Sequence, residues 1–211
     1  MTKDENRSFY NLDVALGMVR DRLATVDLEK QCRNCDAICS AEDTGTTVTL
    51  TYLNRPYVIT FPDLAVSPRD GSEELSLRER ILVLRYLAQA KGTPPTKSLV
   101  TYRDLPGGIV YFPTFSKRTT DQLARRFGNE PESLLEAARP LGGYEINLGD
   151  AGVVIRGFSR VPVNLVLWRG DQEFPAEARL LFDANVTDYL ESEDVTVLCE
   201  TITWKLARYR G

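Results

Sequence analysis

The sequence predicts a single α+β domain, with a mostly antiparallel sheet and helices packed in separate blocks. Two observations carry this prediction. Segments rich in β-branched and aromatic residues cluster in the middle and the C-terminal third of the 211-residue chain, and the helical segments stand apart from them. No Gly-, Ser- or Pro-rich linker divides the chain, so we expect residues 1–211 to form one domain. Residues 1–44 would supply its N-terminal helix and a cysteine segment.

The first predicted element is an amphipathic helix at about residues 8–28, because apolar side chains recur there at steps of three and four. They are Phe9, Leu12, Leu16, Val19, Leu23 and Val26. Strands are predicted at residues 47–53 and 56–61, with a turn at Asn54 and Arg55. Residues 66–74 contain Pro and Gly turn signals and are predicted to be a loop.

A second helix is predicted from residue 77 to Gly92, and a capping box of Ser76 and Glu79 opens it. Residues 99–115, LVTYRDLPGGIVYFPTF, are predicted to be extended on both sides of a Pro-Gly-Gly turn. Helices are predicted next at residues 119–129 and 132–139, and Pro140 ends the second one.

The C-terminal third is predicted to hold four strands followed by two helices. The strands are residues 144–148, 152–158, 163–168 and 178–183. The helices lie near residues 185–191 and 194–209, and the second one has a continuous apolar face. That face consists of Val195, Leu198, Cys199, Ile202, Leu206 and Tyr209.

Composition narrows the class of protein. The chain is 43% hydrophobic and 27% charged, with a net charge of −4, and its charges of both signs are spread along it. A nucleic-acid-binding protein more often has a basic stripe with interleaved aromatic residues, so we expect no nucleic acid partner. The N-terminus has no continuous apolar stretch and no segment is long enough to span a bilayer. We therefore expect a cytoplasmic protein with reduced thiols and no membrane contact.

The chain contains no histidine. This absence removes the usual general base near neutral pH and the commonest metal ligand. Mechanisms of the Ser-His-Asp and Cys-His types are excluded within this chain, and so are histidine ligands to zinc or haem. Any catalysis must use Asp, Glu, Lys, Tyr or Cys side chains, or a bound cofactor.

Three of the four cysteines lie in QCRNCDAIC, residues 31–39, with the spacing Cys32-x2-Cys35-x3-Cys39. The last part of a bacterial ferredoxin run has this spacing, so the thiols are candidate ligands of zinc or an iron–sulfur cluster. Cys199, a carboxylate or an external ligand would complete such a site. The second interpretation, which we favour, is packing, because Leu28 and these three cysteines share one face of a helix and free cysteine is often buried.

Two further segments hold candidate ligand-binding residues. In residues 161–183 they fall at or beside a polar turn between strands, where carboxylates could bind a hard cation or act as acid and base: Trp168, Asp171, Glu173, Phe174 and Asp183. In residues 104–115 glycines could let the backbone approach a ligand between aromatic walls: Gly107, Gly108, Tyr111, Phe112 and Phe115. Solvated turn carboxylates and a tight turn explain the same residues without a ligand.

The chain resembles a family of uncharacterised prokaryotic proteins that is catalogued as a domain of unknown function. The resemblance covers about residues 45–205 and rests on LRERILVLRYLAQAKGTPP, TYRDLPGGIVYFPTF, RPLGG and VPVNLVLWRGDQEFPAEARLLFDANVTDYLESED. Members occur largely in anaerobic bacteria and archaea, and some carry a metal-binding label. The resemblance therefore implies a cytoplasmic protein of anaerobic metabolism, and it supplies no reaction.

These observations favour a ligand- or metal-binding accessory protein over a stand-alone catalyst. Its pocket is expected where the Pro-Gly-Gly segment meets the connection between Trp168 and Asp183. The anaerobic setting suggests a corrinoid as one candidate cofactor beside an iron–sulfur cluster or zinc. Two alternatives stay open. One is a metal-dependent enzyme that uses Asp171 and Asp183 as paired carboxylates, and the other is a protein-interaction module without a small ligand.

Overall fold

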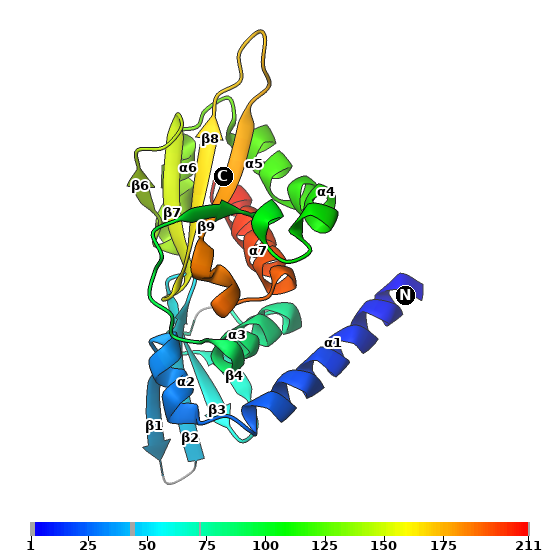
Figure 1. The fold of residues 1–211 in the computed structure, drawn as a ribbon, viewed down its shortest axis with the longest axis vertical. Coiled ribbons are helices and arrows are strands. Elements are labelled where there is room, and N and C mark those ends of the chain that lie inside the picture. The colour runs from blue at the N-terminus through cyan, green and yellow to red at the C-terminus, as the bar shows by residue number, and fades with distance from the viewer. Residues whose placement is uncertain (1–2, 43–44, 72, 211) are drawn as a thin grey trace.

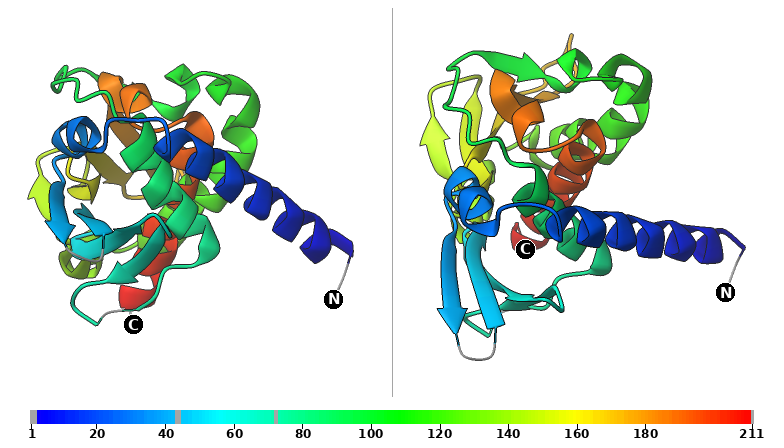
Figure 2. Two further views of the ribbon diagram at one scale, coloured as in Figure 1. Left: turned by 90° about the horizontal axis from the view of Figure 1, so that it is seen from below. Right: turned by 60° about the horizontal axis from the view of Figure 1, so that its bottom comes forward.

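The computed structural model describes residues 3–42, 45–71 and 73–210 (Figure 1). Its α-helices are α1 (Lys3–Leu23), α2 (Leu28–Cys35), α3 (Leu77–Gln89), α4 (Gly108–Arg118), α5 (Thr120–Phe127), α6 (Ser133–Ala138) and α7 (Ser192–Tyr209). Short 3-10 helices are η1 (Tyr102–Asp104), η2 (Arg139–Leu141) and η3 (Ala184–Asp188). Figure 2 shows α1 extending away from the rest of the molecule.

One sheet runs along the molecule in the order β4-β3-β2-β7-β8-β9-β5. In addition, β1 pairs with β2, and β6 pairs with β7. The strands are β1 (Ile38–Glu42), β2 (Gly45–Tyr52), β3 (Arg55–Phe61), β4 (Ala65–Pro68), β5 (Leu99–Thr101), β6 (Tyr144–Ile146), β7 (Ala151–Phe158), β8 (Val161–Trp168) and β9 (Glu177–Asp183). Every pairing is antiparallel. The predicted α+β class with a mostly antiparallel sheet is therefore confirmed.

The sheet consists of two parts that meet at one paired position. Tyr52 of β2 pairs with Phe158 of β7, and the Leu53 N–H donates to the Gly157 carbonyl oxygen at 2.9 Å. Side chains reinforce this junction, because the Phe158 ring stacks on Tyr86 of α3 with centroids 4.0 Å apart. Phe158 and Tyr86 are fully buried. The packing of α3 against the junction thus joins the two parts of the sheet into one core.

The start of the chain differs from the sequence prediction in two places. The predicted helix at residues 8–28 exists, but α1 ends at Leu23 and the side chain of Phe9 lies outside the described residues. A separate helix, α2, ends at Asp36, which adopts the left-handed conformation with φ 58°. Cys39 therefore lies on β1, so the prediction that it shares a helix face with Cys32 and Cys35 is wrong. The predicted loop at residues 66–74 begins with β4, which pairs with β3.

The prediction that residues 99–115 are extended on both sides of the Pro-Gly-Gly turn holds only for β5, because η1 follows it at Tyr102 and a helix follows Gly107. Gly107 has φ 72° and precedes α4, which continues through Pro113 to Arg118. The Phe115 side chain is buried, and its ring stacks on Tyr102 of η1 with centroids 3.9 Å apart. This tertiary contact favours the helix over the strand that the β-branched and aromatic residues suggested.

The remaining elements agree with the sequence. The turn between β2 and β3 is centred on Leu53 and Asn54, which both have positive φ, one residue before the predicted turn at Asn54 and Arg55, because Arg55 already belongs to β3. Ser76 and Glu79 form the predicted capping box at the start of α3. The helices α5, α6 and α7 and the strands β6 to β9 lie where they were predicted, and a 3-10 helix, η3, takes the place of the helix near residues 185–191.

A buried ion pair links α3 to α7 and gives a first prediction. The Arg85 guanidinium donates to Asp194 Oδ1 at 2.9 Å, and Asp194 is 2% exposed. Replacing Arg85 by Ala leaves this carboxylate buried and unpaired, so we expect the free energy of unfolding at pH 7 to fall by about 3 kcal/mol. Denaturant titration measures the loss. Arg80→Ala, on an exposed side of the same helix, is the control and should change little.

The defect should also depend on pH. Burial raises the pKa of Asp194, although Arg85 and Gln89 oppose the rise. The folded state therefore holds this proton more tightly than the unfolded chain, so the stability that protonation contributes is present at low pH and is lost as the pH rises above about 4. We expect the Arg85→Ala defect to grow between pH 4 and pH 7. A defect of equal size at both values would contradict the assigned role of Asp194.

Candidate functional site

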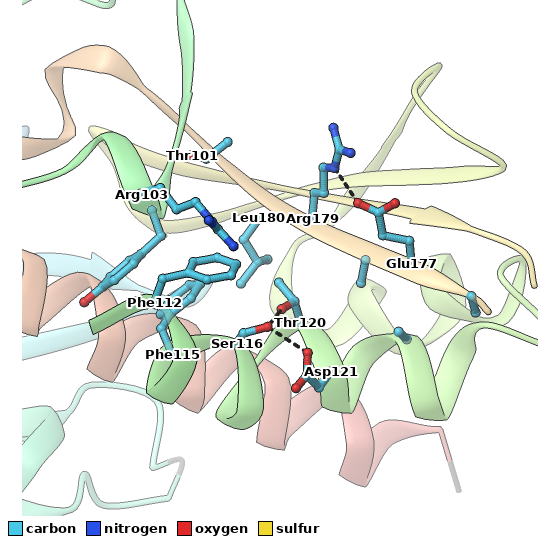
Figure 3. Close-up of a pocket in the computed structure, with 14 residues that line it drawn as sticks. Thr101, Arg103, Phe112, Phe115, Ser116, Thr120, Asp121, Glu177, Arg179 and Leu180 are labelled. Atoms are coloured by element: carbon cyan, nitrogen blue, oxygen red, sulfur yellow. Dashed lines mark hydrogen bonds and ion pairs between the residues drawn. The ribbon is translucent and has the colours of Figure 1, made fainter. Parts of the chain in front are cut away.

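A cavity of about 420 Å³ lies between α4, α5 and the start of β9, beside the end of β5 (Figure 3). This volume falls within the range of ligand pockets in proteins. Three segments that are far apart in the sequence line it. They contribute Thr101, Tyr102 and Arg103; Phe112, Phe115, Ser116, Thr120, Asp121 and Ala124; and Ala176, Glu177, Ala178, Arg179 and Leu180.

One wall of the cavity is aromatic, and two of its rings, those of Tyr102 and Phe115, belong to the buried core. The Tyr102 and Phe115 rings stack with an interplanar angle of 9° and are both buried. Phe112, three residues before Phe115 on α4, lies on the cavity side and is half-buried. The guanidinium carbon of Arg103 lies 3.8 Å from the centroid of the Phe112 ring, a position that suits a cation–π contact.

The polar groups of the cavity are partnered unequally. Arg179 Nε donates to Glu177 Oε1 at 2.7 Å, so these two charges pair with each other. The Ser116 hydroxyl donates to Asp121 Oδ1 at 2.7 Å and lies 2.8 Å from the Thr120 hydroxyl oxygen. Within the described part of the chain, no carboxylate forms an ion pair with Arg103. Figure 3 shows its side chain over Phe112, at the end of the cavity near Thr101.

The residues predicted from the Pro-Gly-Gly segment divide into three groups. Phe112 and Phe115 line the cavity, as walls. Gly107 and Gly108 instead serve the backbone, because Gly107 has positive φ and a Cβ atom on Gly108 would lie 1.9 Å from the Tyr102 carbonyl oxygen. Tyr111 is 63% exposed and faces a neighbouring hollow between α4 and α7.

None of the five residues predicted between strands β8 and β9 lines the cavity. Trp168, at the end of β8, lies under the Arg179 guanidinium with 5.1 Å between the guanidinium carbon and the ring centroid. Asp171 accepts hydrogen bonds from the backbone N–H groups of Glu173 and Phe174 in the connecting turn, and Phe174 is exposed. Asp183 caps η3 at the other end of β9.

Asp171 and Asp183 do not form a pair. Asp171 precedes β9 and Asp183 ends it, and a seven-residue strand spans about 20 Å. Two carboxylates must lie within a few ångströms of one reacting bond to act together as acid and base. The arrangement therefore gives no support to the paired-carboxylate enzyme, and both residues stabilise turns.

The four cysteines lie in three elements, with Cys32 and Cys35 on α2, Cys39 on β1 and Cys199 on α7. Cys35 is buried, and its Sγ lies 3.6 Å from the Tyr86 carbonyl oxygen and 3.8 Å from that of Leu87. Cys32 lies on the same helix, near Cys39 of β1, and burial followed by the charge of Cys39 raises its pKa to about 12. Cys199 is fully buried on α7. Burial also raises the pKa of Cys35 and of Cys199, and protonated thiols are poor metal ligands.

These thiols do not assemble a metal centre. Among the residues that the structure describes, no three Cys, Asp or Glu side chains are placed so that they could hold a metal ion. A structural zinc site or an iron–sulfur cluster uses four converging ligands, and a zinc site completed by an external ligand uses three. The donor set as it stands among the described residues of this structure fits neither arrangement. Metal binding stays a prediction of the sequence, and the geometry favours packing.

Sequence reasoning missed Arg103, Ser116, Thr120 and the start of β9. Arg103 follows a short strand in a segment that was predicted to be extended, where one arginine has no distinguishing pattern. Ser116 and Thr120 are four residues apart and straddle the boundary between α4 and α5. A helical interpretation of residues 108–118 would have placed Ser116 on the same side as Phe112, which was the one available signal.

Asp183 gives a second prediction. Burial raises its pKa, but hydrogen bonds from the Thr96, Asn185 and Lys97 backbone N–H groups and from the Thr96 hydroxyl outweigh that effect, so the pKa is lowered. Asp183→Asn should reduce the free energy of unfolding at pH 7 by about 2 kcal/mol, because the charged acceptor is lost. The stability that the charge confers is present above about pH 4 and is lost as the pH falls through the lowered pKa.

Denaturant titrations of the wild type and of Asp183→Asn between pH 3 and pH 7 measure the difference in their free energies of unfolding. The control is Asp171→Asn, at the exposed turn, for which we expect a smaller loss. An Asp183→Asn protein that is as stable as the wild type at pH 7 would contradict the capping role.

Cys35 gives a third prediction. Cys35→Ser should lower the free energy of unfolding by about 1–2 kcal/mol, because a more polar group replaces a buried thiol. Elemental analysis of samples purified without oxygen should show the same metal content in both proteins. Cys39→Ser, at a half-buried position, is the matched control. Loss of stoichiometric metal in Cys35→Ser, with or without a loss in Cys39→Ser, would restore the interpretation of these thiols as ligands.

No helix among the described residues has both the length and the apolar character needed to cross a membrane. Searches of curated proteins and of solved structures found no match to the chain. A family model described as "Domain of unknown function (DUF3786)" matches residues 27–204, and this range includes the cysteine segment, which the resemblance in the sequence had left out. The chain therefore belongs to the family with the domain of unknown function DUF3786.

Proposed function

We propose that this protein is a binding protein for a compact ligand that carries a carboxylate, held in the cavity between α4, α5 and β9. One observation carries the proposal: the Arg103 guanidinium carbon lies 3.8 Å from the centroid of the Phe112 ring at the cavity, and Arg103 has no ion-pair partner among the described residues. A planar guanidinium binds a carboxylate through two parallel hydrogen bonds, and stacking on an aromatic ring fixes its orientation in advance.

The other cavity groups support the same role. Glu177 already neutralises Arg179, and Asp121 already accepts a hydrogen bond from Ser116. An incoming carboxylate therefore meets one cation without an ion-pair partner, beside aromatic walls. The hydroxyl protons of Ser116 and Thr101 are already donated to Asp121 and Asp104, so Arg103 is the donor that the site offers. None of these groups is a histidine, and no activated nucleophile lines the cavity, so binding accounts for the site without a reaction.

The size of the cavity limits the ligand. A volume of about 420 Å³ lies near the lower end of the range for ligand pockets. A corrinoid ring system is larger than this space, so we do not include a corrinoid in the proposal. A location in the cytoplasm and a place in anaerobic metabolism stay predictions that the cavity does not address.

The proposal predicts that Arg103 controls carboxylate binding. Titration of the ¹⁵N-labelled protein with benzoate should shift the backbone amide signals of cavity residues such as Thr101 and Ser116. Arg103→Gln should weaken this binding by about tenfold or more, because a charge-assisted bidentate contact is lost. Arg103→Lys keeps the charge but not the two-pronged geometry and should bind with intermediate affinity.

Arg80→Gln is the matched control, because it removes the same charge from an exposed position on α3. We expect it to bind benzoate as the wild type does. Equal binding by wild type, Arg103→Gln and Arg80→Gln, or shifts confined to residues away from the cavity, would overturn the proposal.

A further inference from the structure

The start of β9 has an open edge beside the cavity. Strand β5 pairs with β9 at Leu181, Phe182 and Asp183, and among the described residues the preceding part of β9 has no strand partner on that side. The cavity contacts both the end of β5 and the β9 residues that β5 leaves unpaired. It therefore lies where a continuation of β5 would run.

The backbone groups that face this edge follow from the ladder. The Ala184 N–H donates to the Ser98 carbonyl oxygen across β5, and the direction of N–H and C=O groups alternates along a strand. Ala178, six residues earlier, therefore directs its N–H and C=O to the same side, away from β8. On β8 the Asp150 N–H donates to the carbonyl oxygen of Leu167, the residue opposite Ala178, so Leu167 also directs its backbone away from β9.

We propose that the ligand of this cavity is a short, extended, acidic peptide segment, which adds to the open edge of β9 by pairing with Ala178 and places its carboxylate on Arg103. This inference deepens the proposed function and rests on it. A main chain in extended conformation supplies one donor and one acceptor to Ala178, as in other cases of strand addition. The peptide carboxylate then meets the cation that stands at the β5 end of the same cavity.

Charge and shape select this occupant over a second copy of the chain. The edge carries Glu177 and Arg179, and charged side chains on an edge strand oppose sheet-to-sheet pairing of two large proteins. The helices α4 and α5 form the opposite side of the cavity, so the space admits a narrow chain. Among the described residues, two charges at the site have no ion-pair partner, Arg103 at the β5 end and Asp121 on α5. The positive one, Arg103, complements an acidic segment.

A proline substitution tests the pairing directly. Ala178→Pro removes the outward N–H but leaves the hydrogen bonds between β8 and β9, because proline is tolerated where an edge-strand N–H faces away from the sheet. Ala178→Ser keeps the N–H and is the matched control. The probes are benzoate and a tripeptide of threonine, valine and aspartate, acetylated and amidated at its ends, each titrated into the ¹⁵N-labelled protein.

We expect the tripeptide to bind about tenfold more tightly than benzoate, because it adds main-chain hydrogen bonds. Ala178→Pro should cancel this advantage, so that the variant binds the tripeptide no more tightly than it binds benzoate. Ala178→Ser should keep the tenfold difference between the two probes. If Ala178→Pro fails to fold, methylation of the valine amide of the peptide provides the same test from the ligand side, with the same expected loss.

The outcomes separate the two proposals. Tripeptide binding that is no tighter than benzoate binding, or that survives both Ala178→Pro and methylation, overturns strand addition and leaves carboxylate binding in place. Benzoate and tripeptide binding that both survive Arg103→Gln overturn the proposed function itself. A wild-type dimer in light scattering that Ala178→Pro converts to a monomer would assign the edge to a second copy of the chain and overturn the peptide assignment.

Discussion

The stacked rings of Phe158 and Tyr86 hold together a sheet whose two parts share one paired position. A ladder of one pair contributes little cooperativity, so the contact between α3 and this junction must fix how the parts are oriented. Everything beyond the junction follows from that orientation. Strands β7, β8 and β9 extend from it in sequence, and α7, linked to α3 through Arg85 and Asp194, covers them. The cavity lies at the far end of this arrangement.

Most of the fold follows from local patterns in the sequence. Clusters of β-branched and aromatic residues mark β7 and β8, spacing by three and four marks α3 and α7, and the Ser76–Glu79 capping box fixes a helix start. The failures have physical causes. Asp36 ends α2 in a left-handed conformation that aspartate tolerates but does not require, so the helix pattern ran on to Cys39. In α4 the stacking of Phe115 on Tyr102 overrides residues with strand propensity.

Only the aromatic walls of the site could be anticipated from the sequence. Phe112 and Phe115 were predicted as walls because aromatic residues near glycines suggest a pocket, although they were placed on strands. The facing segment, Ala176 to Leu180, was not predicted as part of a site, because its residues have the pattern of an ordinary strand. This segment contributes backbone groups that β5 leaves unpaired, and an unpaired backbone cannot be recognised from the residue types in a sequence. The charge balance that isolates Arg103 depends on which side chains fold next to one another, and the sequence does not contain that information locally.

The close approach at Gly108 limits how the sequence of this protein can vary over time. A Cβ atom there would lie 1.9 Å from the Tyr102 carbonyl oxygen, so η1 and α4 touch through their backbones. Any larger residue would force these segments apart and would separate Arg103 from Phe112, whatever else was retained. At Gly107, by contrast, a Cβ atom would lie 3.5 Å from the Tyr111 ring, which is an ordinary contact. The positive φ is therefore the main constraint there, and asparagine tolerates it better than other side chains do. Of these two adjacent glycines, Gly108 therefore tolerates no side chain, whereas Gly107 can be replaced by a residue that accepts a positive φ.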